Sequence, residues 1–120
     1  MNLSENEQQQ ELRSPAEKTA RIRELNDDFR RGLADGIVLL TAGVKGLPSA
    51  LQERILNRVR SFDEFNADND PHQEHDFGAF EIHGVTYFWK LDLYEQPGVK
   101  DADGEPVVTR VLTIMLAEDY

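Results

Sequence analysis

The sequence predicts an α+β fold, a two-layer sandwich with two helices packed on a mainly antiparallel sheet of three to four strands. Two stripes of apolar residues at spacings of three and four occur in the first half of the chain, and alternating apolar and polar residues occur in the second half. The chain has 120 residues, enough for one hydrophobic core and too few for two. We therefore expect residues 14–120 to form a single domain, in the order helix, strand, helix and three strands.

The first helix is predicted to begin at residue 15, after a tail over residues 1–13 that is rich in Gln, Glu and Asn and is expected to be disordered. Ser14 can cap the helix, Pro15 suits the first helical position, and Glu17 completes a capping box. The glycines at 32 and 36 can end it. The apolar stripe consists of Ile22, Leu25, Phe29 and Leu33.

The segment over residues 37–41 is short, apolar and partly β-branched, which predicts a buried strand, with an extension of the helix as the alternative.

A second helix is predicted to begin at residues 47–49. Its apolar face consists of Leu51, Ile55, Leu56, Val59 and Phe62. Arg54, Arg58 and Arg60 make much of the rest basic. An anion or an acidic partner could bind these arginines, although solvated arginines on an exposed helix face are the commoner case.

The second half of the chain predicts a loop followed by three strands. Residues 63–76 are acidic and contain a proline, so we expect a loop. Strands are expected at residues 80–82 and 85–94, joined by a two-residue turn at His83-Gly84. The strand at residues 85–94 is expected to direct alternate side chains to the core: Val85, Tyr87, Trp89, Leu91 and Leu93. Residues 95–106 are predicted to be a loop. Residues 107–116 form the last strand, and its two apolar faces predict a central position in the sheet.

Charge is distributed unevenly between the two halves. The formal net charge is −10; residues 1–60 carry ten Lys or Arg against nine Asp or Glu, and residues 61–120 carry three against fourteen. An acidic half repels phosphate backbones and attracts basic protein surfaces. The sequence therefore predicts a small acidic, non-enzymatic interaction protein without direct nucleic-acid binding, unless the carboxylates serve only solubility. The residues expected to contact the partner are Asp68, Asp70, Glu74, Asp101, Asp103 and Glu105.

No signal in the chain points to export or to a membrane. The first 14 residues lack the apolar segment of a signal peptide, and the longest apolar run, residues 37–40, is far too short to cross a bilayer. We expect a cytoplasmic protein. The chain has no cysteine, which excludes disulfides and thiolate metal ligands. The sequence leaves the oligomeric state open.

The alternative function is a small metal-dependent enzyme that uses residues 70–76. His72 and His75 could share a zinc, manganese or iron ion, with Asp70 or Asp76 completing the ligand set. His75 and Asp76 could also act as a general base and its orienting acid, although no nucleophile is apparent. The spacing is not that of the helical HExxH motif. Turns formed by the acidic residues, and an ion pair from Asp76 to Arg54 or Arg58, are the competing structural interpretation, with no cofactor.

Four segments resemble a family of small bacterial proteins that is classed as a domain of unknown function and is often carried on plasmids or other mobile elements. They are TAGV, FDEFNADNDPHQEHDFGAFE, YFWKLDLY and TRVLTIMLAEDY, and they cover most of residues 41–120. The family more often has glycine at the position of Gln73, so the resemblance leaves the conformation of the loop there open. The resemblance implies a bacterial cytoplasm and no particular activity. Combined with the charge, it suggests a mobile-element accessory or anti-defence protein that acts by nucleic-acid mimicry on a nuclease or another nucleic-acid-binding protein.

Overall fold

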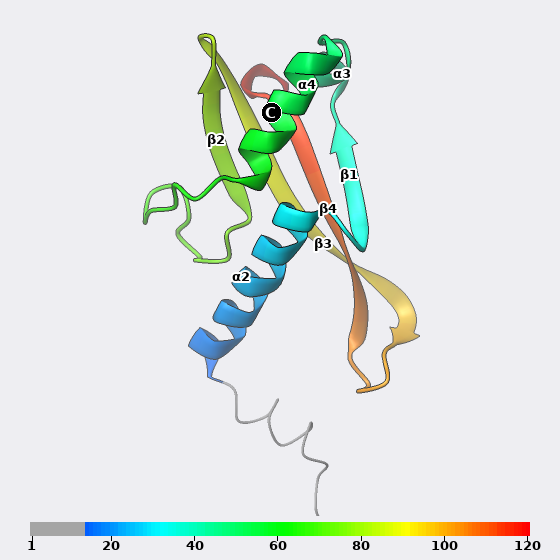
Figure 1. The fold of residues 1–120 in the computed structure, drawn as a ribbon. Helices are drawn as coiled ribbons and strands as arrows, with labels where there is room; N and C mark the ends of the chain where they lie inside the picture. Colours follow the sequence, from blue (N-terminus) through cyan, green and yellow to red (C-terminus); the bar gives the residue numbers. More distant parts are fainter. Residues whose placement is uncertain (1–13) are drawn as a thin grey trace, which may run out of the picture.

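The computed structural model describes residues 14–120 and places its helices on one face of a four-stranded sheet (Figure 1). The predicted α+β sandwich is therefore confirmed, while the tail predicted over residues 1–13 lies outside the described part. No helix in residues 14–120 is long and apolar enough to cross a membrane. The elements are α2 (Pro15–Gly32), β1 (Gly36–Leu40), α3 (Ala42–Lys45), α4 (Ser49–Arg60), β2 (Phe77–Ile82), β3 (Val85–Lys100), β4 (Pro106–Leu116) and the 3₁₀ helix η1 (Ala117–Asp119).

Both long helices begin as expected, but only part of the predicted apolar stripe of α2 reaches the core: Phe29 is buried and Leu33 packs against it, whereas Ile22 and Leu25 are only half-buried. The Ser14 hydroxyl accepts a hydrogen bond from the Glu17 N–H at 3.2 Å, which satisfies one free donor of the first turn of α2. On α4, Ile55 and Val59 are completely buried, and Phe62 follows in the same core. The short helix α3 was not predicted, because four residues are too few to show a helical period.

The sheet has the order β1-β4-β3-β2, with β1 parallel to β4 and the other pairs antiparallel. The predicted central position of the last strand, β4, is confirmed. The predicted burial of the strand at residues 37–41 is wrong, because β1 is an edge strand. Its Val38 and Leu40 pack against the core, whereas Ile37 and Leu39 on the opposite face are about half exposed.

The core lies between the helices and the alternate residues of β3. Trp89 and Tyr87 are buried completely or nearly so, and Leu91 is close behind. Val85 and Leu93 share this predicted face but are exposed, because they lie at its two ends. His83 and Gly84 form the predicted turn between β2 and β3, and both have positive φ (49° and 78°), as the tight turns of hairpins require.

The loop predicted at residues 95–106 is wrong over most of its length, because β3 and β4 continue as a two-stranded ribbon beyond the sheet (Figure 1). We call residues 93–108 the arm. Pro97 and Gly98 fall where the strand register shifts, between Glu95 and Lys100, so the irregularity that their composition indicates is an interruption of the ladder within the arm. The tip is organised by Asp101, whose Oδ1 accepts the backbone N–H groups of Asp103 and Glu105 at 2.9 and 3.0 Å.

Candidate functional site

The loop over residues 63–76 is held against α2 by polar side chains of that helix. Arg23 donates to the carbonyl oxygen of Gln73 at 3.0 Å, and the Asn26 amide donates to that of Glu74 at 2.9 Å. Asn26 is buried, and its own oxygen accepts from Arg110 Nε at 3.0 Å. These bonds satisfy loop carbonyls that a hydrophobic helix face would leave without donors. The loop is therefore fixed along the helix at successive residues.

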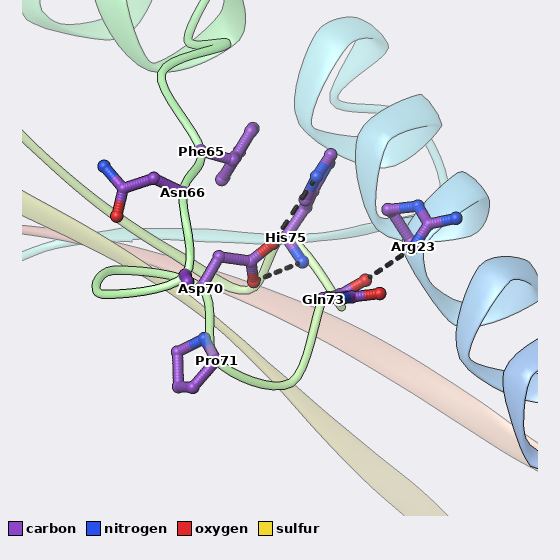
Figure 2. Close-up of a pocket in the computed structure, with 8 residues that line it drawn as sticks. Arg23, Phe65, Asn66, Asp70, Pro71, Gln73 and His75 are labelled. Carbon is purple, nitrogen blue, oxygen red and sulfur yellow. Dashed lines mark hydrogen bonds and ion pairs between the residues drawn. The ribbon is translucent and has the colours of Figure 1, made fainter.

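His75 is held between the carboxylates of Asp27 and Asp70 at the centre of this contact, and Figure 2 shows its contacts with Asp70. Its Nδ1 lies 2.9 and 3.0 Å from the two carboxylate oxygens of Asp27, and its Nε2 lies 3.5 Å from Asp70 Oδ2. The other oxygen of Asp70 accepts the backbone N–H of His75 at 3.1 Å. The imidazole also stacks on the ring of Phe65, with centroids 3.7 Å apart and planes 4° from parallel. Both ring nitrogens and one face of the ring are thus in contact.

The loop backbone is strained at two of these positions. Gln73 and His75 have φ of 57° and 54°, the left-handed region that glycine adopts most readily. For a residue with a side chain this conformation costs roughly 1–2 kcal/mol. The bonds to Arg23, Asp27 and Asp70 offset that cost, since they engage the backbone or side chain of the strained residues themselves.

Arg30 extends the network into the core. Its guanidinium is fully buried, donates to Asp27 at 3.1 Å and to the carbonyl oxygens of Val59 and Arg60 at 2.8 and 3.2 Å, and lies 5.0 Å from the ring of Trp89. Burial lowers the pKa of Arg30, and Asp27 offsets part of this effect. Through its bonds to the carbonyl oxygens of Val59 and Arg60, Arg30 caps the end of α4.

The two helices cap each other. In return for the cap supplied by Arg30, Arg60 at the end of α4 donates through Nε to the carbonyl oxygen of Arg31 at 2.8 Å, near the end of α2. Positive side chains at both helix ends also complement the helix dipoles. The pair therefore fixes the angle between the helices and, through α2, the position of the loop.

An open pocket of about 360 Å³ lies beside His75. It is lined by Arg23, Phe65, Asn66, Ala67, Asp70, Pro71, Gln73 and His75, most of which Figure 2 labels. A general base needs one ring nitrogen within reach of a bound molecule. Because both nitrogens of His75 contact carboxylates, the arrangement favours a structural role for His75, the fixing of the loop.

The predicted metal ligands do not converge. His72 is exposed, whereas Asp70 is 5% exposed and bonded to His75. Asp76 accepts from the Leu91 N–H through its backbone oxygen. Among residues 14–120, no three His, Cys, Asp or Glu side chains come together as a metal site would require.

The predicted ion pair from Asp76 to the arginines of α4 is wrong for the part of the chain that the structure covers. Arg54 lies 3.0 Å from His83 Nε2, and Arg58 donates to the carbonyl oxygen of Glu81 at 3.4 Å. The strand β2 separates the acidic loop from the turn at His83, so these arginines reach the far end of β2 instead.

The predicted docking carboxylates fall into two groups on opposite sides of α2 (Figure 1). In the loop, Asp68 is exposed, Glu74 is half-buried and Asp70 is buried, so only Asp68 presents its carboxylate fully to solvent. The arm carries the other group at its exposed tip: Asp101, Asp103 and Glu105. These three line an open groove of about 590 Å³ whose opposite side is formed by Lys18, Arg21, Ile22 and Leu25 of α2.

Sequence reasoning missed the network on α2. Arg23, Asn26, Asp27 and Arg30 follow a helical spacing of three and four, but such polar residues usually face solvent. One signal was available: Asn26 and Arg30 directly follow Leu25 and Phe29 of the apolar stripe, so they lie beside the buried face.

Comparison with known proteins gives one result. The model of a family described as "Protein of unknown function (DUF3768)" matches residues 40–119. The curated proteins and the solved structures give no match to this chain. The matched range contains the acidic loop and the arm but not α2.

Proposed function

The chain belongs to the DUF3768 family of proteins of unknown function, and we propose that it is a non-enzymatic interaction protein whose arm docks a basic protein surface. The observation that carries this proposal is the composition of the arm surface. The arm exposes large apolar side chains beside its carboxylates: Leu93, Tyr94, Val99 and Val108 are between 37% and 58% exposed. Exposed apolar residues, with tyrosine prominent, are typical of binding surfaces.

The chemistry of the arm supports a partner with a basic surface. Glu95, Asp103 and Glu105 are exposed acidic residues of the arm and would attract Lys and Arg side chains and speed their approach. On the facing side of the groove, Ile22 and Leu25 offer an apolar contact, whereas Lys18 and Arg21 would repel a basic partner, so the charge contact falls on the arm. A basic surface with apolar residues between its charges fits this arm.

A nuclease or another nucleic-acid-binding protein is the concrete form of this partner. Such proteins carry basic grooves that recognise rows of phosphate charge. An acidic ribbon that enters such a groove would exclude the nucleic acid, which is the mimicry expected of an anti-defence protein. The loop carboxylates are left out of this surface, because Asp70 is buried, Glu74 is half-buried, and the exposed Asp68 lies on the other side of α2 from the arm. The metal-dependent enzyme stays an untested alternative.

The test is capture of partners by the tagged full chain, with quantification of each bound protein at two salt concentrations. The arm variant carries Asp103→Lys and Glu105→Lys and keeps Asp101, because Asp101 organises the tip. The matched control carries Asp63→Lys and Glu64→Lys, which make the same charge change at exposed positions of the loop.

We expect a partner that binds more weakly at higher salt, is lost with the arm variant and is retained with the control. Duplex DNA should compete for it if the mimicry is correct. An identical set of captured proteins for the arm variant and the wild type would refute docking through the arm. A partner lost only with the control variant would place the interaction on the loop instead.

A further inference from the structure

A second charged surface lies between α4 and β2, and its charge is positive. Arg54, Asn57, Arg58, Ser61 and Ile82 line an open pocket of about 250 Å³. Its lining contains two guanidinium groups and no carboxylate, in a chain whose net charge is −10. A pocket of this size accommodates a small polar group rather than a whole cofactor.

Both guanidinium groups are on exposed residues and contact uncharged neighbours. Arg58 lies 5.1 Å above the ring of Phe80 and donates to the carbonyl oxygen of Glu81. Arg54 lies 3.0 Å from Nε2 of His83, which must accept, because a guanidinium has only donors. Neither contact neutralises charge. Side chains that are already ordered lose less conformational entropy when a ligand binds.

The positive charge of the pair is not cancelled by carboxylates. Within residues 14–120, neither Arg54 nor Arg58 forms an ion pair with Asp or Glu, whereas Arg21 and Arg30 both do. In a protein with 23 acidic residues, two neighbouring arginines without such partners keep a local positive potential.

One nearby feature would oppose an anion, and the structure neutralises it. The C-terminal end of α4 carries partial negative charge on its last carbonyls. Arg30 donates to the carbonyls of Val59 and Arg60, and the Ser61 hydroxyl donates to that of Asn57 at 2.8 Å. The donors that remain for an anion are therefore the two guanidinium groups and the Asn57 amide.

We propose that this pocket binds a phosphate group, held by Arg54 and Arg58. Two arginines presenting planar forks of N–H donors match the several oxygens of a phosphate better than the two of a carboxylate. The site is separate from the arm, since the arm is formed by the far ends of β3 and β4. Phosphate binding can therefore be tested without regard to the docking proposal.

The experiment is a titration of the ¹⁵N-labelled full chain with inorganic phosphate at constant ionic strength, followed by NMR. Amide signals of Asn57, Ser61 and Ile82 should shift and saturate, and acetate at equal ionic strength should produce a much smaller change. The Arg54→Gln and Arg58→Gln variants should each weaken binding by about tenfold, the loss expected for one charge-assisted hydrogen bond. Arg21→Gln removes an exposed arginine on α2 and should leave binding unchanged.

Three results would overturn the proposal. They are shifts that do not saturate in the wild type, shifts that persist in a variant lacking both arginines, and an effect of acetate as strong as that of phosphate. The spectra themselves report whether each variant is folded. An Arg58→Lys variant keeps the charge but loses the fork, so full binding by this variant would also contradict the assigned geometry.

Discussion

Replacing Arg30 by methionine tests whether the buried network holds the domain together. Methionine keeps an unbranched stem against Trp89 but cannot donate to Asp27 or to the carbonyls of Val59 and Arg60. Removing one partner of a buried ion pair costs about 3–5 kcal/mol, since the remaining charge stays buried. Asp27 is mostly buried and retains His75 as a partner, so we expect the lower part of that range, about 3 kcal/mol.

The assay is urea unfolding followed by the fluorescence of Trp89, the only tryptophan of the chain. A loss of about 3 kcal/mol is a large part of the 5–15 kcal/mol that typically stabilises a domain, so the midpoint should fall markedly at an unchanged slope. Arg31→Met is the matched control, because Arg31 is the exposed neighbour and contributes its backbone carbonyl to the Arg60 bond. It should change stability by no more than about 0.5 kcal/mol. Equal midpoints for the two variants would refute the assignment of Arg30 as the cap of α4.

Three further predictions concern the loop and the sheet. Gln73→Gly should raise the free energy of unfolding by about 0.5–1 kcal/mol, because glycine removes the cost of the left-handed conformation; a lower urea midpoint would contradict the assigned φ. Gly78→Ala should destabilise the protein by about 1–3 kcal/mol in the same assay, since an added Cβ would meet the Trp89 ring, whereas Gly32→Ala, which meets no atom within 4 Å, should not. Chelation of metal ions should leave the melting temperature in calorimetry unchanged, because both nitrogens of His75 already contact carboxylates; a drop, together with stoichiometric metal in the purified protein, would revive the metal hypothesis.

The sequence predicted those parts of the fold in which side-chain period and burial agree. The spacing of Ile55 and Val59 marks α4, and the alternation of Tyr87, Trp89 and Leu91 marks the centre of β3. The period carries no information on which strands pair. The edge position of β1 and its parallel pairing with β4 therefore could not be read from its apolar composition.

The site was harder to predict than the fold, because its interactions join polar residues far apart in the chain. His75 was singled out from the sequence, but its partner Asp27 lies 48 positions away in the chain. Its ring contact Phe65 is nearer and lies in the same loop. The arm was missed for another reason. Pro97 and Gly98 are typical of loops, and a two-stranded ribbon accommodates them where its register shifts and one strand need not complete the ladder.

The helix α2 has a consequence for what counts as the folding unit of this chain. The stretch that matches the family begins at residue 40. The helix α2 precedes it, yet this helix provides the side chains of Asp27 and Arg30 that anchor His75 and the end of α4. A fragment cut to the shared stretch would leave the carbonyls of Val59 and Arg60 without the donors of Arg30, and His75 without the carboxylate of Asp27. The boundary of the shared stretch therefore cuts through the network that joins α2 to the rest of the domain, and we expect a shortened version of the protein to fold only if it begins before Pro15.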